Sequence, residues 1–166
     1  MPFTRSSGTR PRAALPFCAM LQVSRPERFR ARTKKLPRWV HEMLRDTSAS
    51  YLQDSDHGRT IELADPLVAF EAGAQLRLDR PLPPFFAAVG TRDPLLDDTR
   101  RLERALATIN VPCEARYYPG GLHAFHALVW DPAARRCWRD ALAFLDRHLR
   151  TGRDRVPVAG AVPQAG

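Results

Sequence analysis

Short apolar runs alternate with longer stretches of helical periodicity along most of the chain. Residues 15–23 (LPFCAMLQV) and 85–90 (FFAAVG) are continuous apolar runs, which is typical of strands buried on both faces of a parallel sheet. Residues 114–118 (EARYY) are predicted as a third strand. The hydrophobic pattern therefore predicts about three strands, separated by helices.

Three segments have helical spacing. In residues 37–52 the helical spacing is only partial, which predicts either one helix or a pair of short helices. In residues 97–109 apolar residues recur at helical spacing, at Leu102, Leu106 and Ile109, which predicts one helix. Residues 53–84 are a long connector with turn residues, which is typical of a functional loop or lid. A final helix over 132–149 is predicted to place five apolar residues on one face: Trp138, Ala141, Leu142, Leu145 and Leu149.

The order of strands and helices indicates an α/β fold with a parallel sheet and right-handed crossovers. At 166 residues the chain is the size of one domain, which we place at residues 15–150. Residues 1–14 are polar and show no periodicity, so we predict that the chain begins with a disordered segment. Residues 151–166 are rich in Gly, Pro, Val and Ala, so we predict a flexible C-terminal tail.

The basic charge does not point to nucleic acid. The net charge is +8, but all except two of the 26 basic residues are arginines spread along the chain. The densest basic run, residues 25–38, is interpreted as a solvated loop or the approach to a helix. Dispersed charge favours solubility without forming a phosphate-binding surface, so no nucleic-acid partner is predicted.

The cysteines and the hydropathy indicate a soluble cytoplasmic protein. Cys18, Cys113 and Cys137 are an odd number without CxxC spacing, so neither a zinc site nor a disulfide framework is predicted. No apolar run has the roughly 20 residues needed to span a bilayer, and no signal peptide is evident. The sequence predicts no cofactor.

Candidate chemistry lies directly after two of the predicted strands. Asp93 lies in GTRDPLLDD (residues 90–98), and His123 lies in PGGLHAF (residues 119–125). The carboxyl ends of parallel strands meet at one edge of a sheet, where functional groups collect. A carboxylate there can hold the tautomer and orientation of an imidazole, so Asp93 and His123 are predicted as a catalytic pair.

Other interpretations of these residues remain open. Asp93 is also compatible with a helix cap or turn residue, and His123 with an exposed loop residue. His126 is a competing base one turn further on. A metal site at His123 and His126 is not predicted, because the sequence shows no carboxylate or thiolate partner for the two imidazoles.

Residues 82–98 and 117–125 resemble the acid and histidine motifs of α/β-hydrolases of the hormone-sensitive-lipase-like branch. The resemblance covers about residues 65–149, and more loosely reaches back to residue 15. It implies the C-terminal part of an α/β-hydrolase acting on small-molecule esters, with Asp93 as triad acid and His123 as general base. Asp97 and Asp98 would open the following helix, and residues 25–65 would lie in part near the cap and substrate pocket.

Two elements of that family's pattern are missing from the 166 residues. The triad serine belongs in a GxSxG elbow, and no GxSxG and no HisGlyGlyGly-type oxyanion loop occurs. None of the serines suits an elbow: Ser6, Ser7, Ser24, Ser48, Ser50 and Ser55. Both elements lie upstream in the family, so we expect a truncated hydrolase that is inactive alone.

The alternative is a non-catalytic interaction module, in which the Asp93 and His123 pair is a relic. Without upstream strands, the apolar run 15–23 would also present an unpaired sheet edge. The sequence therefore predicts possible self-association through that edge.

Overall fold

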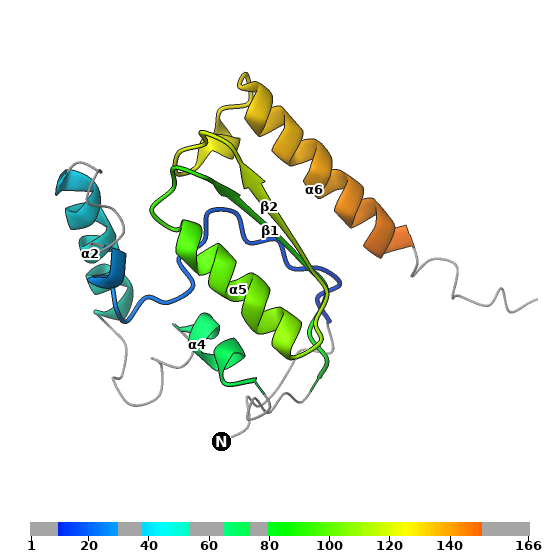
Figure 1. The fold of residues 1–166 in the computed structure, drawn as a ribbon, viewed down its shortest axis with the longest axis horizontal. Helices are drawn as coiled ribbons and strands as arrows, with labels where there is room; N and C mark the ends of the chain where they lie inside the picture. Colours follow the sequence, from blue (N-terminus) through cyan, green and yellow to red (C-terminus); the bar gives the residue numbers. More distant parts are fainter. Residues whose placement is uncertain (1–9, 30–37, 54–64, 74–79, 151–166) are drawn as a thin grey trace, which may run out of the picture.

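The computed structural model describes residues 10–29, 38–53, 65–73 and 80–150. Within these ranges, two strands and four complete α-helices follow in the order α2, α4, β1, α5, β2, α6, and a short 3-10 helix, η2, precedes α6 (Figure 1). Their bounds are α2 Arg38–Leu52, α4 Pro66–Glu71, β1 Phe85–Gly90, α5 Leu96–Thr108, β2 Cys113–Tyr118, η2 Phe125–Ala127 and α6 Pro132–Arg150.

The sheet is parallel, as predicted. β1 pairs with β2 in a continuous register that runs from Phe85 opposite Cys113 to Gly90 opposite Tyr118. Helix α5 makes the crossover between them, and the two strands therefore end at the same rim of the sheet.

The prediction of a regular first strand over residues 15–23 is wrong. Only two isolated bridges form, Ala14 with Phe85 and Phe17 with Ala88, both parallel to β1. Pro16 lies between them and has no N–H to donate, which keeps the ladder from becoming continuous. The extended backbone ends at Cys18, whose φ of 47° lies in the left-handed region.

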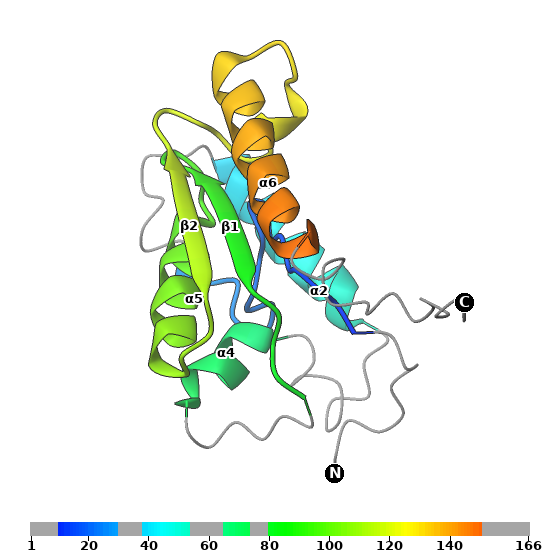
Figure 2. The same cartoon turned by 90° about the vertical axis from the view of Figure 1, so that its right-hand side faces the viewer.

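Helices cover both faces of the sheet. Figure 2 shows α4 and α5 on one side of the strands and α6 on the other. The side chains of β1 alternate accordingly, because Phe85 and Ala87 pack with the α5 residues whereas Phe86 and Ala88 pack with α6. All six residues of β1 are buried, which explains its unbroken apolar sequence.

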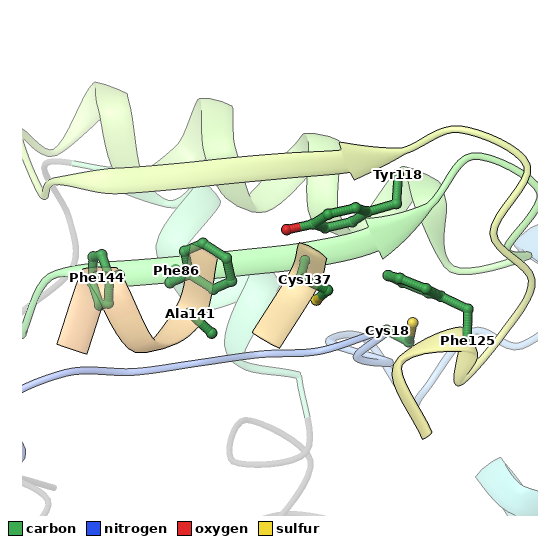
Figure 3. Packing of buried hydrophobic residues seen from close by; sticks show 8 residues of the cluster. Cys18, Phe86, Tyr118, Phe125, Cys137, Ala141 and Phe144 are labelled. Carbon is green, nitrogen blue, oxygen red and sulfur yellow. The ribbon is translucent and has the colours of Figure 1, made fainter. Parts of the chain in front are cut away.

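Helix α6 has the predicted extent, but its predicted apolar face is buried only in part, at Ala141 and partly at Leu145. Trp138, Leu142 and Leu149 are exposed. The face toward the strands carries Cys137, Ala141 and Phe144 (Figure 3), and Ala134 is buried as well. Phe144 fills the space beside Phe86, with ring centroids 5.6 Å apart, and this contact sets the rotation of the helix.

The remaining helices connect the N-terminal part to the sheet. α2 is one helix rather than two, and its Val40 and Leu44 pack with Phe29 and Leu95. The predicted turn at Asp65 and Pro66 is the start of α4, with Pro66 in the first helical turn. Residues 1–9 and 151–166 of the predicted start and tail lie outside the described residues, as do 54–64 and 74–79 of the connector.

Buried carboxylates fasten the segment after Cys18. Asp98, in the first turn of α5, pairs with Arg28 and accepts the backbone N–H of Leu21 at 2.8 Å. Asp65, just before α4, accepts the backbone N–H groups of Val23 and Ser24 at 2.7 and 3.0 Å. These contacts hold residues 21–28 against the helices on one face of the sheet.

Candidate active site

Asp93 lies in the turn between β1 and α5. Its backbone N–H donates to Gly90 at 3.1 Å, which closes the turn directly after the strand. Its carboxylate is buried, and Oδ1 accepts the N–H of Leu95 at 2.7 Å. A short local hydrogen bond of this kind fixes the side chain, so the carboxylate keeps one orientation.

His123 reaches the same carboxylate from the loop after β2. Its Nδ1 lies 3.2 Å from Oδ2 and 3.4 Å from Oδ1 of Asp93. The imidazole is 44% exposed, whereas the Asp93 side chain is fully buried. The two predicted residues are therefore in contact, with the acid inside and the base facing outward.

The contact favours one tautomer of His123. With Nδ1 turned to a carboxylate, the neutral ring carries its proton on Nδ1, and Nε2 remains for proton exchange. The hydrogen bond to Asp93 raises the pKa of His123 above its usual range, although partial burial opposes this shift. A base held this way accepts a proton more readily than a free imidazole.

Two glycines let the two loops approach each other. A Cβ atom on Gly90 would lie 2.1 Å from the carbonyl oxygen of Gly121, so this position excludes any side chain. The N–H of Arg92 donates to that same oxygen at 3.0 Å, and the N–H of Gly120 donates to the Thr91 hydroxyl at 2.9 Å. These bonds fix the distance between Asp93 and His123.

His126, the competing base, occupies a different environment. It makes no hydrogen bond to Asp93, and its ring packs against Phe17 at a centroid distance of 5.2 Å. Burial, and then the neighbouring His123, lower its pKa. The structure thus separates the two histidines, because only His123 is oriented by the acid.

Sequence reasoning missed one residue of this rim, Cys18. Its Sγ lies 3.9 Å from Nδ1 of His126 and within 4.8 Å of ligand atoms of both Asp93 and His123. The thiol is buried, and burial together with Asp93 raises its pKa to about 12. No local spacing reveals this residue, because it comes from the end of a segment more than seventy positions upstream.

Two non-glycine residues at the rim have strained backbones. Cys18 has a φ of 47° and Ala124, next to His123, a φ of 56°. Such left-handed conformations cost about 1–2 kcal/mol for residues with a Cβ atom, and they concentrate at functional sites. Both lie within the loops that build the candidate site.

The described serines are used elsewhere. The Ser24 hydroxyl donates to Asp65, Ser48 is buried beside Met20, and Ser50 is exposed on α2. None of these three hydrogen-bonds to His123, and Ser6, Ser7 and Ser55 lie outside the described residues. Among the described residues, none of these three hydroxyls therefore takes part in the contact between Asp93 and His123.

Comparison with known proteins identifies the fold family of the chain. A sequence model of the α/β hydrolase fold matches residues 3–127. The chain belongs to the α/β hydrolase fold family. The predicted α/β fold is thereby confirmed, although only two regular strands form among the described residues.

Solved structures extend the comparison. An esterase/lipase from an uncultured bacterium matches with a TM-score of 0.63, at 20% identity over 84% of this chain and 44% of its own. An esterase from the bacterial hormone-sensitive lipase family has a TM-score of 0.63, at 21% identity over 86% of this chain and 45% of its own. A hormone-sensitive lipase from a metagenome library also has a TM-score of 0.63, at 17% identity over 86% and 45%. The resemblance to this branch is thus confirmed at the level of the fold, and the chain spans less than half the length of these proteins.

No helix in the part of the chain that the structure describes combines the length and the apolar character that crossing a bilayer requires.

Proposed function

We propose that Asp93 and His123 are the acid and the general base of a serine-hydrolase triad that cleaves small carboxylic esters. The observation that carries the proposal is the 3.2 Å contact between the buried Asp93 carboxylate and Nδ1 of the half-exposed His123. It places a fixed acid behind a base that substrate can reach, which is the relation the triad requires.

The chemistry assigns each group one task. Nε2 of His123 takes the proton of a serine hydroxyl as that oxygen attacks the ester carbonyl. Asp93 holds the imidazole and stabilises the imidazolium that forms. His123 then gives the proton to the departing alcohol, which leaves an acyl-serine. A water molecule, deprotonated by His123 in the same way, attacks the acyl carbonyl; the bond to the serine oxygen breaks, the carboxylic acid leaves, and His123 returns the proton to the serine oxygen. The serine and the oxyanion donors are not supplied by the 166 residues.

We further propose that these 166 residues alone do not turn over esters. Without a nucleophile there is no acyl-enzyme, and each missing oxyanion donor forfeits about 3–4 kcal/mol of transition-state stabilisation. The test is hydrolysis of a short-chain nitrophenyl ester by the purified chain and by His123→Ala. Both are expected to match the buffer blank. Turnover that disappears in His123→Ala would show that the chain contains a nucleophile.

A polypeptide carrying a GxSxG segment of the same family supplies the positive test. Mixed or fused with this chain, it is expected to hydrolyse the ester, and Asp93→Asn and His123→Ala are each expected to lower kcat at least about 10³-fold. His126→Gln is the matched control, because His126 does not contact Asp93. Equal loss in all three variants would contradict the assigned roles.

The second candidate function is an interaction module, and one observation favours it. Ala14 and Cys18 form backbone hydrogen bonds with the β1 side, whereas among the described residues Leu15 and Phe17 form none. An edge of this kind can pair with another strand. We propose self-association through residues 14–18, expected as a dimer in size-exclusion chromatography with light scattering. Leu15→Pro should shift the dimer to monomer and Leu15→Ala should not; a monomeric wild-type chain would contradict the proposal.

We make two further predictions about the chain, one on its location and one on nucleic-acid binding. A cytoplasmic location follows from the free thiols of all three cysteines, and fluorescence microscopy of the tagged chain tests it. The chain is also expected not to bind nucleic acid. Salt-dependent retention on immobilised DNA would contradict that expectation.

A further inference from the structure

We propose that Cys18, Asp93 and His123 form a binding site for one Zn²⁺ ion. The three residues come from three separate segments: the end of residues 14–18, the turn after β1 and the loop after β2. Each offers one ligand atom, and the three atoms lie within 4.8 Å of one another. Neither the α/β fold nor the proposed triad requires a thiol at this place.

The spacing fits tetrahedral zinc after small shifts. Bonds of about 2.0–2.3 Å to nitrogen, oxygen and sulfur place the ligand atoms of a tetrahedral site about 3.3–3.8 Å apart. Nδ1 of His123 and the two carboxylate oxygens of Asp93 already lie 3.2 and 3.4 Å apart. The thiol therefore needs to approach by about an ångström at most.

A fourth potential ligand atom, a nitrogen of His126, lies beside the group. Nδ1 of His126 is 3.9 Å from Sγ of Cys18, close to the separation of two ligands on one ion. Its ring is braced by Phe17, and its backbone carbonyl accepts the indole N–H of Trp138 at 2.9 Å. The fold thus brings a carboxylate, Asp93, and a thiol, Cys18, close to the two histidines from distant positions in the sequence.

The burial of Cys18 and Asp93, and the negative charge that both can carry, favour the binding of a cation between them. Cys18 and Asp93 are 5% exposed, so two groups that can carry negative charge lie close together away from water. Zinc binding forms the zinc–sulfur bond and releases the thiol proton to solvent, and the ion then neutralises the carboxylate and the thiolate together. The 44% exposed imidazole of His123 gives the ion access from solvent.

The ligand types select the metal. A set of thiolate, carboxylate and imidazole groups suits Zn²⁺, whereas Mg²⁺ and Ca²⁺ prefer oxygen ligands only. A nucleophilic role for Cys18 fits less well, because reactive cysteines have a lowered pKa and a positively charged, accessible environment. Here burial and Asp93 raise the pKa of the thiol to about 12.

One consequence rests on the proposed function. The ion would occupy the Asp93 carboxylate and a ring nitrogen of His123, and would so remove both the acid and the base from catalysis. Zn²⁺ would then inhibit the triad reversibly. Zinc binding itself is measured without any esterase assay, so failure of the zinc site and failure of the proposed function give separate results.

The test is metal titration of the full chain after treatment with a chelator. Calorimetry with ZnCl₂ is expected to give one ion per chain, and CoCl₂ is expected to give a thiolate-to-cobalt charge-transfer band with the visible bands of tetrahedral cobalt. Cys18→Ser should abolish the charge-transfer band and weaken zinc at least about tenfold, since even loss of a residue behind the ligands typically costs 10–100-fold. Cys113→Ser is the matched control and should keep both signals.

Two further variants cover the case in which Cys18→Ser does not fold, which circular dichroism reports. Asp93→Asn and His123→Gln should each weaken zinc at least about tenfold and keep the thiolate band. Zinc should also raise the Tm of the wild-type chain and not that of these variants. No one-to-one binding to the wild-type chain, a band that survives in Cys18→Ser, or equal affinity in all variants would overturn the site.

Discussion

Asp93 and Asp98 are two buried carboxylates five positions apart, and they face opposite kinds of partner. Asp98 is fully buried against Arg28, a group that stays charged at any ordinary pH, and against the backbone N–H of Leu21. Asp93 is buried against His123, whose imidazole is half exposed and whose pKa the hydrogen bond to Asp93 raises. Burial alone therefore does not distinguish the structural carboxylate of Asp98 from the catalytic acid that we propose at Asp93. The side chain that each carboxylate contacts does distinguish them.

The same difference separates two regions of the molecule. Around Asp98 and Asp65, carboxylates bind permanent donors and fasten one segment to another. At the rim with Asp93, the partners are groups that can lose or gain a proton, and the backbone is strained at Cys18 and Ala124. We expect substitutions in the first region to change stability, and substitutions in the second to change proton affinity.

The largest expected effect is on stability at Asp98. Asp98→Asn leaves the largely buried Arg28 without its countercharge, and we expect the free energy of unfolding to fall by about 3–5 kcal/mol. Asp146→Asn removes an exposed carboxylate that pairs with Arg150, and should cost less than about 1 kcal/mol. Urea denaturation measures both. Similar losses in the two variants would remove the distinction between the two carboxylates.

The next effect concerns the contact between the rim loops. Gly90→Ala places a Cβ atom against the Gly121 carbonyl, and we expect a loss of about 2–3 kcal/mol together with a fall in the pKa of His123 as the loops separate. Gly73→Ala is the control, because its φ of 60° makes alanine costly there while the rim is untouched. A normal His123 titration in Gly90→Ala would show that the loops do not depend on this approach.

A smaller effect is expected in the pH dependence of stability. Because Asp93 raises the folded-state pKa of His123, the pair stabilises the chain fully below the unfolded-state pKa of about 6.5, and this contribution disappears as pH rises through the folded-state pKa. Solvent screening of the half-exposed ring should keep it under about 1 kcal/mol. The difference in unfolding free energy between wild type and His123→Gln should therefore shrink with rising pH. A difference that grows would reverse the sign.

The smallest effect is expected at Ala124. Its φ of 56° suits glycine, so Ala124→Gly should stabilise the chain by a few tenths to about 1 kcal/mol. Ala143→Gly, on the exposed side of α6, should instead destabilise by about 0.5–1 kcal/mol. Thermal unfolding distinguishes the two signs. Destabilisation by both variants would show that Ala124 is not strained.

Most of the fold could be predicted from the sequence because the hydrophobic pattern within each element determines whether that element is a strand or a helix. β1 is an unbroken apolar run, and Leu102 and Leu106 on α5 recur at helical spacing, so both elements lie within one residue of the predicted bounds. The predicted face of α6 was correct at Ala141 but wrong at Trp138, Leu142 and Leu149, which are exposed. The prediction left out Phe144, whose ring packs beside Phe86. Tertiary packing, rather than periodicity, chose that face.

The candidate site also contains residues that could be predicted from the sequence and one that could not. Asp93 and His123 were predictable because each follows a strand and parallel strands end at one rim. Cys18 was not, because its place depends on two isolated bridges and a left-handed residue that end an irregular segment beside β1. The place of Cys18 among the zinc ligands we propose therefore depends on long-range contacts, which no spacing along the chain encodes.

The most direct measurement is the side-chain NMR spectrum of His123 as a function of pH. The structure predicts a neutral ring with its proton on Nδ1, a pKa above the usual value, and a fall of that pKa in Asp93→Asn but not in His126→Gln. A neutral ring protonated on Nε2, or a pKa that does not change in Asp93→Asn, would contradict the pairing of Asp93 with His123.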